Sequence, residues 1–178
     1  MDTREITLLS VITALCIGIQ LTPRPPNVEF TSLLVFLTGF LFGVRFGIFL
    51  GALVMFVNGL LSPWGFAGGI LPFQILGMAI IGLAGGVYRR TFKSIDFSLE
   101  HLLEVTLLGA FFTLVYDFIT NAGHALLFGP DLIAVIITGA LFTLIHVLSN
   151  TLMFAFAFIP LVEVIKKFLG GDVKWRKG

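Results

Sequence analysis

The sequence contains few charged residues. Asp, Glu, Lys and Arg make up 12% of its 178 residues, about half their usual share in a soluble domain. It contains one cysteine, Cys16, which excludes a disulfide within the chain and a metal site built from several cysteines. Hydrophobic residues make up 57%. A soluble core of this size cannot bury so much apolar surface, so we expect lipid as the main solvent around a single domain, 1–178.

Motifs of several enzyme classes are also missing. The sequence has no G-x-x-x-x-G-K-[ST] loop for ATP and no H-E-x-x-H metal spacing. It has no G-x-S-x-G nucleophile elbow. A hydrolase could be imagined with His124, His146 and Asp117 as a metal set, but no motif supports it. We therefore predict that the chain is not an enzyme, has no resident metal or cofactor and binds no nucleic acid.

The hydrophobic runs predict an all-α integral membrane protein, a bundle of about six transmembrane helices. A spanning helix needs roughly 20 apolar residues, within a range of about 17–25. Proline, glycine and charged residues separate the runs. The predicted helices cover about 6–22, 30–44, 46–61, 71–88, 105–128 and 132–168, with Arg45 interrupting between the second and third and a basic tail at 170–178.

The basic residues predict the orientation of this bundle. Six helices put both ends on one side, and cytoplasmic loops of membrane proteins carry an excess of Lys and Arg. Arg24 is the one basic residue expected outside. The cytoplasmic side would hold the other ten: Arg4, Arg45, Arg89, Arg90, Lys93, Lys166, Lys167, Lys174, Arg176 and Lys177. We therefore expect both termini in the cytoplasm and the helices in the cell membrane.

Polar residues inside the predicted helices crowd toward the outer half of the membrane. Such residues are costly in lipid and usually face the protein interior or a cavity. Asp117, Asn121 and His124 follow at i, i+4 and i+7, which predicts one stripe on a helix. An outward-facing pocket with apolar walls and a few polar groups would explain them. The candidate ligand contacts are Asn58, Trp64, Gln74, Tyr116, Asp117, Asn121, His124, His146 and Asn150.

Other roles for these residues stay open. Asn, Gln and His also form hydrogen bonds between membrane helices, which would make His146 and Asn150 structural. Trp64 could be an interfacial anchor. Asn27 and Glu29, in the first loop, can be read as solvated residues.

Small residues form a second pattern. Ser10, Ala14 and Gly18 recur at i, i+4 and i+8, which allows close approach of another helix. This small-residue stripe serves either packing inside the bundle or docking of a partner subunit. The glycines of the fourth predicted helix, Gly77, Gly82, Gly85 and Gly86, are expected to serve internal packing.

Several segments carry a family resemblance. They are Ser62-Pro63-Trp64-Gly65, Pro72-Phe73-Gln74-Ile75-Leu76-Gly77, Leu114-Val115-Tyr116-Asp117-Phe118-Ile119-Thr120-Asn121 and Ile145-His146-Val147-Leu148-Ser149-Asn150. With the helix number and size, they make the chain resemble the S components of energy-coupling factor (ECF) vitamin transporters. The cobalamin-type and pantothenate-type branches look nearest.

The resemblance implies a function. S components capture a vitamin from outside and associate with a transmembrane T component and two cytoplasmic ATPases. An Ala-xxx-Ala motif on the first helix contacts the T component, and here the matching positions are Ser10, Ala14 and Gly18. The vitamin itself is not specified. The alternative is a stand-alone, proton-linked secondary transporter with Asp117 and His124 as a proton relay.

Overall fold

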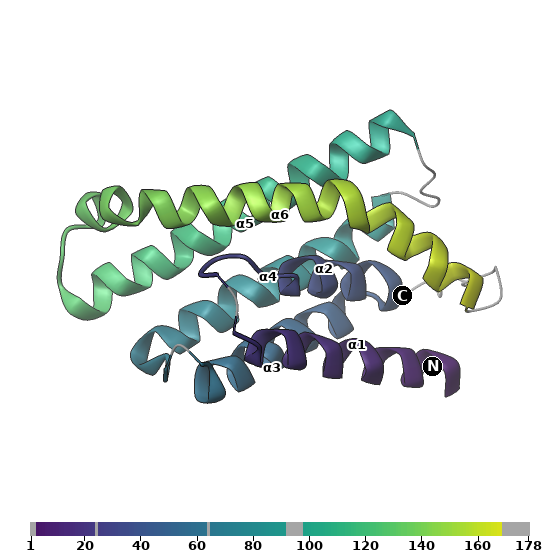
Figure 1. The fold of residues 1–178 in the computed structure, drawn as a ribbon, viewed down its shortest axis with the longest axis horizontal. Coiled ribbons are helices and arrows are strands. Elements are labelled where there is room, and N and C mark those ends of the chain that lie inside the picture. The colour runs from purple at the N-terminus through teal and green to yellow at the C-terminus, as the bar shows by residue number, and fades with distance from the viewer. Residues whose placement is uncertain (1–2, 24, 64, 92–97, 169–178) are drawn as a thin grey trace.

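The computed structural model describes residues 3–23, 25–63, 65–91 and 98–168, and every regular element in them is helical. The predicted all-α class is thus confirmed. The first helix begins and the last one ends at the same end of the bundle (Figure 1). The elements are α1 (Thr3–Leu21), α2 (Thr31–Phe42), α3 (Val44–Leu61), the 3-10 turn η1 (Gly68–Ile70), α4 (Leu71–Thr91), α5 (Leu99–Phe128) and α6 (Leu132–Phe168).

The helices have the length and composition of a membrane-embedded protein. Four helical stretches in the described residues are long and apolar enough to cross a membrane: Val44–Leu61, Gly68–Thr91, Leu99–Phe128 and Leu132–Phe168. Two apolar helices, Ile6–Leu21 and Thr31–Phe42, are shorter. With 37 residues, α6 is about 55 Å long, more than the hydrocarbon layer requires. It contains Pro160 and bends toward its C-terminal end (Figure 1).

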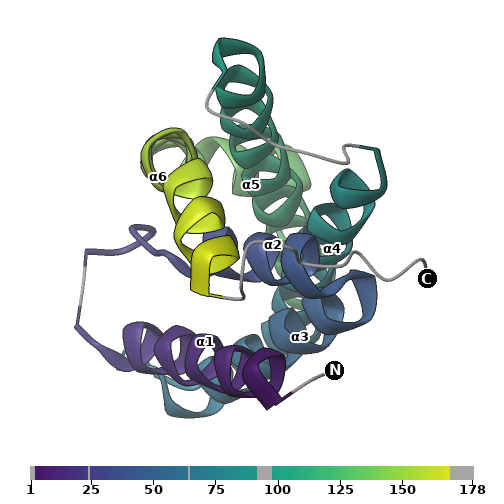
Figure 2. The same ribbon diagram turned by 90° about the vertical axis from the view of Figure 1, so that its right-hand side faces the viewer.

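The short helix α2 is the centre of the bundle. Its residues 31–41 are all buried, and the other helices surround it (Figure 2). Phe36 and Phe40 pack edge-on against Phe154 and Phe158 of α6, with ring centroids 5.4 Å apart in both pairs. Twelve residues span only about 18 Å, well short of the roughly 30 Å hydrocarbon layer. Helix α2 therefore fills the centre of the bundle along only part of its length.

Glycines bring α2, α3 and α4 into backbone contact. A Cβ atom added to Gly82 would lie 2.1 Å from the carbonyl oxygen of Gly47. A Cβ on Gly39 would lie 2.1 Å from the carbonyl oxygen of Gly82, and one on Gly85 would meet the carbonyl of Phe36. Gly86 approaches Val44 in the same way, and Gly77 lies against the Tyr116 ring. The predicted packing role of the α4 glycines is confirmed.

Two predicted helix boundaries were wrong. The break between α2 and α3 falls at Gly43, whose φ of 99° suits glycine, so Arg45 lies in the first turn of α3 instead of interrupting the chain. Helix α5 begins at Leu99, six residues before the predicted start at 105. The Ser98 side chain caps it by accepting a hydrogen bond from the backbone N–H of His101.

Candidate ligand-binding site

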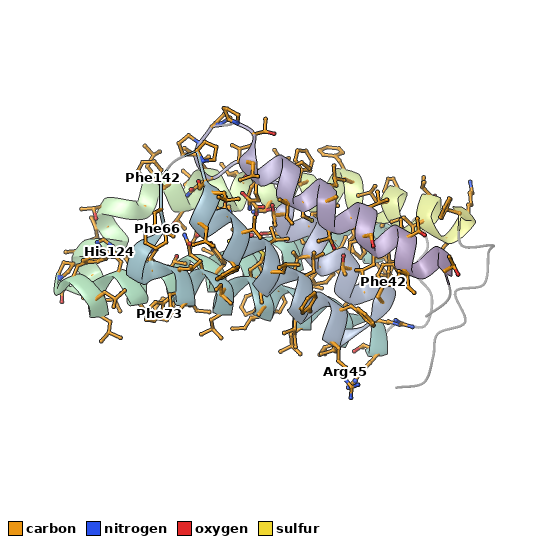
Figure 3. All side chains as sticks on the ribbon, turned by 90° about the horizontal axis from the view of Figure 1, so that it is seen from below. Phe42, Arg45, Phe66, Phe73, His124 and Phe142 are labelled. Carbon is orange, nitrogen blue, oxygen red and sulfur yellow. The ribbon has the colours of Figure 1, made fainter. Side chains whose placement is uncertain are left out.

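A cavity of about 600 Å³ lies where α2 and α4 begin and α3 ends, with α5 and α6 as the opposite wall. Phe66 and Phe142, which line it, lie toward the end of the bundle opposite Phe42 and Arg45 (Figure 3). Six of the nine predicted ligand contacts line this cavity: Asn58, Gln74, Tyr116, Asp117, Asn121 and His146.

The first loop forms part of the cavity wall. The chain between α1 and α2 runs along the cavity, where Pro25, Pro26 and Asn27 line it, and then enters the bundle at the buried Glu29. Asn27 anchors this loop to α6. Its side-chain amide donates to the carbonyl oxygen of Phe142 at 2.9 Å, and the Ser149 hydroxyl donates to the carbonyl oxygen of Asn27 at 3.0 Å. These hydrogen bonds therefore fix the loop in place as one wall of the cavity.

Three ionisable side chains meet at the base of the cavity. His146 Nδ1 lies 2.7 Å from Asp117 Oδ1 and donates a hydrogen bond to it. On the other side of the ring, His146 Nε2 lies 3.5 Å from Glu29 Oε1. All three side chains are buried and all three line the cavity. We call Glu29, His146 and Asp117 the carboxylate–histidine cluster.

Glu29 also caps the central helix. Its carboxylate accepts hydrogen bonds from the backbone N–H groups of Thr31 and Ser32 and from the Ser32 hydroxyl. These donors at the start of a helix favour a negative charge. Burial alone raises the pKa of the Glu29 carboxyl, but the neighbouring His146 and the Ser32 donors outweigh it and hold the pKa well below its usual range. The interpretation of Glu29 as a solvated loop residue was wrong.

Three oxygen atoms of cavity-lining residues have no hydrogen-bond partner among the residues that the structure describes. They are Asn58 Oδ1, Gln74 Oε1 and Asp117 Oδ2. Each is buried, and an unpaired buried polar atom costs about 1–3 kcal/mol. All three belong to residues that line the cavity, and they come from three different helices. A ligand with several N–H or O–H groups would satisfy them.

The other predicted contacts do not line the cavity. His124 is exposed and its ring contacts Phe128 with centroids 4.7 Å apart. It lies about 10 Å along α5 from Asp117, outside the part of the helix that lines the cavity. The structure therefore places Asp117 and Asn121 at the cavity and His124 away from it. Asn150 is fully buried and donates to Glu29 Oε1 at 3.4 Å. Trp64 lies outside the described residues.

The structure shows how the acidic and histidine side chains of the described residues are grouped. Among the described residues, no group of three or more His, Cys, Asp and Glu side chains is arranged to hold a metal ion. Asp117 pairs with His146 on the neighbouring helix instead of with His124 on its own. A relay of Asp117 with His124 stays a prediction.

The small-residue stripe of α1 faces away from the bundle. Ser10, Ala14 and Gly18 are all exposed, and a Cβ atom on Gly18 would meet nothing within 4 Å. Internal packing therefore does not explain the stripe. The large side chains Val11 and Leu15, on the same helix, are also about half exposed, at 57% and 48%.

The fold and the site define an all-helical, membrane-embedded protein with a polar cavity between its helices. Neither the protein-family models nor the curated proteins compared with this chain gave a match.

Sequence reasoning missed Glu29 and the loop around it. A charged residue between two apolar runs is normally interpreted as part of a solvated loop. The sequence around Glu29 does not show that this loop is buried. The one available signal was the predicted second helix itself, which at 30–44 was already shorter than a typical span.

Proposed function

We propose that the chain is a substrate-capture subunit of a membrane importer, of the kind represented by the S components of ECF vitamin transporters. The observation that supports this most is the cavity with three unpartnered acceptor oxygens, Asn58 Oδ1, Gln74 Oε1 and Asp117 Oδ2. A pocket with apolar walls and a few convergent polar groups is typical of small-molecule binding. The family resemblance supplies the ligand class, a vitamin or related micronutrient.

The proposal includes an orientation. Both described ends of the chain lie at one end of the bundle, and the cavity lies toward the other (Figures 1 and 3). With the positive-inside bias of the sequence, this arrangement supports termini in the cytoplasm and a cavity that faces the outside of the cell membrane.

The partners follow from the resemblance. The chain would dock onto a transmembrane T component and, through it, two ATPases. The exposed stripe of Ser10, Ala14 and Gly18 supports this role for α1, because small side chains let a partner helix approach closely. ATP hydrolysis would then come from the partners.

Substitution within α5 tests the cavity. Asn121→Ala should weaken vitamin binding about 10-fold, since Asn121 lines the cavity and a lost polar contact costs on the order of 1–2 kcal/mol. His124→Ala, three residues along the same helix, is the matched control and should leave affinity unchanged, because His124 is exposed. Isothermal titration of the purified variants measures both. Equal effects of the two changes on affinity would show that the cavity is not the ligand-binding site.

Substitution within α1 tests the docking surface. Ala14→Leu should prevent co-purification with a T component and leave ligand affinity unchanged, because the larger side chain keeps the partner helix away. Ala134→Leu makes the same change at an exposed position on α6 and should assemble normally. Assembly of the Ala14→Leu variant at the wild-type level would show that this stripe is not the interface.

A second candidate is a stand-alone, proton-linked transporter. The buried carboxylate–histidine cluster favours it, since chains of Asp, Glu and His form proton relays in membrane transporters. Uptake by liposomes that contain the chain alone, abolished by an uncoupler, would support this candidate. Uptake only after the T component and ATPases are added would support the first.

A further inference from the structure

We propose that the ligand of this cavity carries no net negative charge and presents several hydrogen-bond donors. It would be a neutral or cationic small molecule with amine, amide or hydroxyl groups, and compounds that bear a carboxylate or phosphate would be rejected. This inference rests on the proposed function and specifies the substrate class within it.

The charges around the cavity are the first argument. His146 has a carboxylate oxygen facing each ring nitrogen, at 2.7 and 3.5 Å. A doubly protonated imidazole satisfies this geometry, because both of its nitrogens are donors. Even then, one positive charge stands against the two carboxylates of Glu29 and Asp117. Among the described residues that line the cavity, none is Lys or Arg. The described part of the lining therefore carries a net negative charge.

The unpartnered atoms are the second argument, and two of the three belong to the uncharged amides of Asn58 and Gln74. Asn58 Oδ1, Gln74 Oε1 and Asp117 Oδ2 are all oxygens, which accept hydrogen bonds. Asp117 is only 8% exposed, its Oδ1 is already paired with His146, and its Oδ2 is buried without a partner in the described part of the chain. The described lining has one other unpartnered polar atom, His146 Nε2, which already faces a carboxylate oxygen of Glu29 at 3.5 Å. An anionic group brings more acceptors and would leave the three oxygens unsatisfied. A ligand with N–H or O–H groups pairs with them.

The remaining walls set the size and character of the ligand. Met55, Met78 and Phe66 contribute apolar surface, and the Tyr116 ring meets the His146 ring edge-on at 5.7 Å. A cavity of about 600 Å³ lies in the range of sites for small molecules. The class is therefore a compact molecule that combines apolar surface with attached donor groups.

The test compares molecules that differ in one carboxylate. Three matched pairs serve as probes: pantothenol with pantothenate, pyridoxamine with 4-pyridoxic acid, and nicotinamide with nicotinate. Equilibrium dialysis against the purified full chain measures the affinity for each. In parallel, the compound that co-purifies with the chain is released by denaturation and identified by mass spectrometry. In every pair that binds, the carboxylate-free member should bind about 10-fold tighter or more, since like charges at short range cost several kcal/mol.

One variant and two controls test which residues cause the preference for the carboxylate-free molecule. Asp117→Asn should reduce the discrimination within a pair, because it removes one negative charge and keeps the side-chain shape. Glu163→Gln removes an exposed carboxylate on α6 and should leave the discrimination unchanged. Arg24→Gln should also leave it unchanged, since no cation is required for binding. A loss of binding on Arg24→Gln would point to an anionic ligand and overturn the inference.

The outcomes separate the inference from the proposed function. A released compound with amine, amide or hydroxyl groups and no acid, or tighter binding of the carboxylate-free twin, supports the inference. A released carboxylate or phosphate, or equal or tighter binding of the acid twin, overturns it and leaves vitamin capture standing. If no compound is released and no probe binds, the proposed function fails and the inference fails with it.

Discussion

Replacement of Gly82 by valine is expected to prevent α3 and α4 from packing. Even a single added carbon at Gly82 would lie 2.1 Å from the carbonyl oxygen of Gly47, and the neighbouring atoms are backbone, which cannot rotate away. Overpacking a core costs about 1–3 kcal/mol when side chains can adjust, and here the helices themselves must separate. We expect a loss beyond that range. Thermal unfolding of the detergent-purified protein, read by size-exclusion chromatography, measures it.

The same change at Gly18 is the matched control. A Cβ atom there meets nothing within 4 Å, so Gly18→Val should leave the melting temperature close to that of the wild type. Gly82→Ala should fall between the wild type and Gly82→Val, because one carbon already overlaps Gly47. A Gly82→Val protein as stable as the Gly18→Val protein would contradict the close approach of these helices.

The fold was largely predictable because hydropathy reports directly on contact with lipid. The predicted bounds of the last helix, 132–168, agree with the structure. The start of α5 was missed because Glu100 and Glu104 resemble a loop, although a capped helix accommodates them. Hydropathy gives no information on which helix is central. The burial of α2 follows from glycine contacts with α3 and α4, which are long-range.

The candidate site was predictable only in part, for a related reason. Depth in the membrane could be counted along each helix, and it brought Asp117 and His146 to a similar level. Their pairing at 2.7 Å depends on how α5 and α6 cross, which the sequence does not state. The spacing placed His124 on the same face of the helix as Asp117, but it could not show that the cavity ends before His124. Glu29 was missed because the depth of a loop is set by tertiary packing.

Replacement of Glu29 by alanine is expected to have the largest effect at the site itself. The change removes the acceptor for the N–H groups of Thr31 and Ser32 at the start of the central helix. It also leaves His146 with one carboxylate and removes the acceptor of the Asn150 amide. Breaking a buried ion pair from one side costs about 3–5 kcal/mol. We expect a marked drop in melting temperature and loss of ligand binding.

Glu29→Gln separates the contribution of the helix cap from that of the negative charge, and Glu163→Ala is the control for removal of an exposed carboxylate. The glutamine keeps an acceptor for the helix cap but removes the charge, so it should recover part of the stability and little of the binding. Glu163 is exposed on α6, and Glu163→Ala should change neither quantity. Wild-type stability in the Glu29→Ala variant would show that the cluster does not hold α2 in place.

The pH dependence of the Glu29→Ala effect gives a further check, because its sign is fixed by the lowered pKa. A carboxyl whose pKa is lower in the folded than in the unfolded protein stabilises the fold fully above the unfolded value, which is 4.5 for glutamate. The stabilisation is lost as the pH falls through the lower, folded value. The difference in melting temperature between wild type and Glu29→Ala should therefore be constant from neutral pH down to about 5 and shrink below it. A difference that grew on acidification would mean that Glu29 is protonated in the folded protein. With Glu29 neutral, a doubly protonated His146 would balance the carboxylate of Asp117, and the lining would no longer carry the net negative charge on which the preference for a neutral or cationic ligand rests.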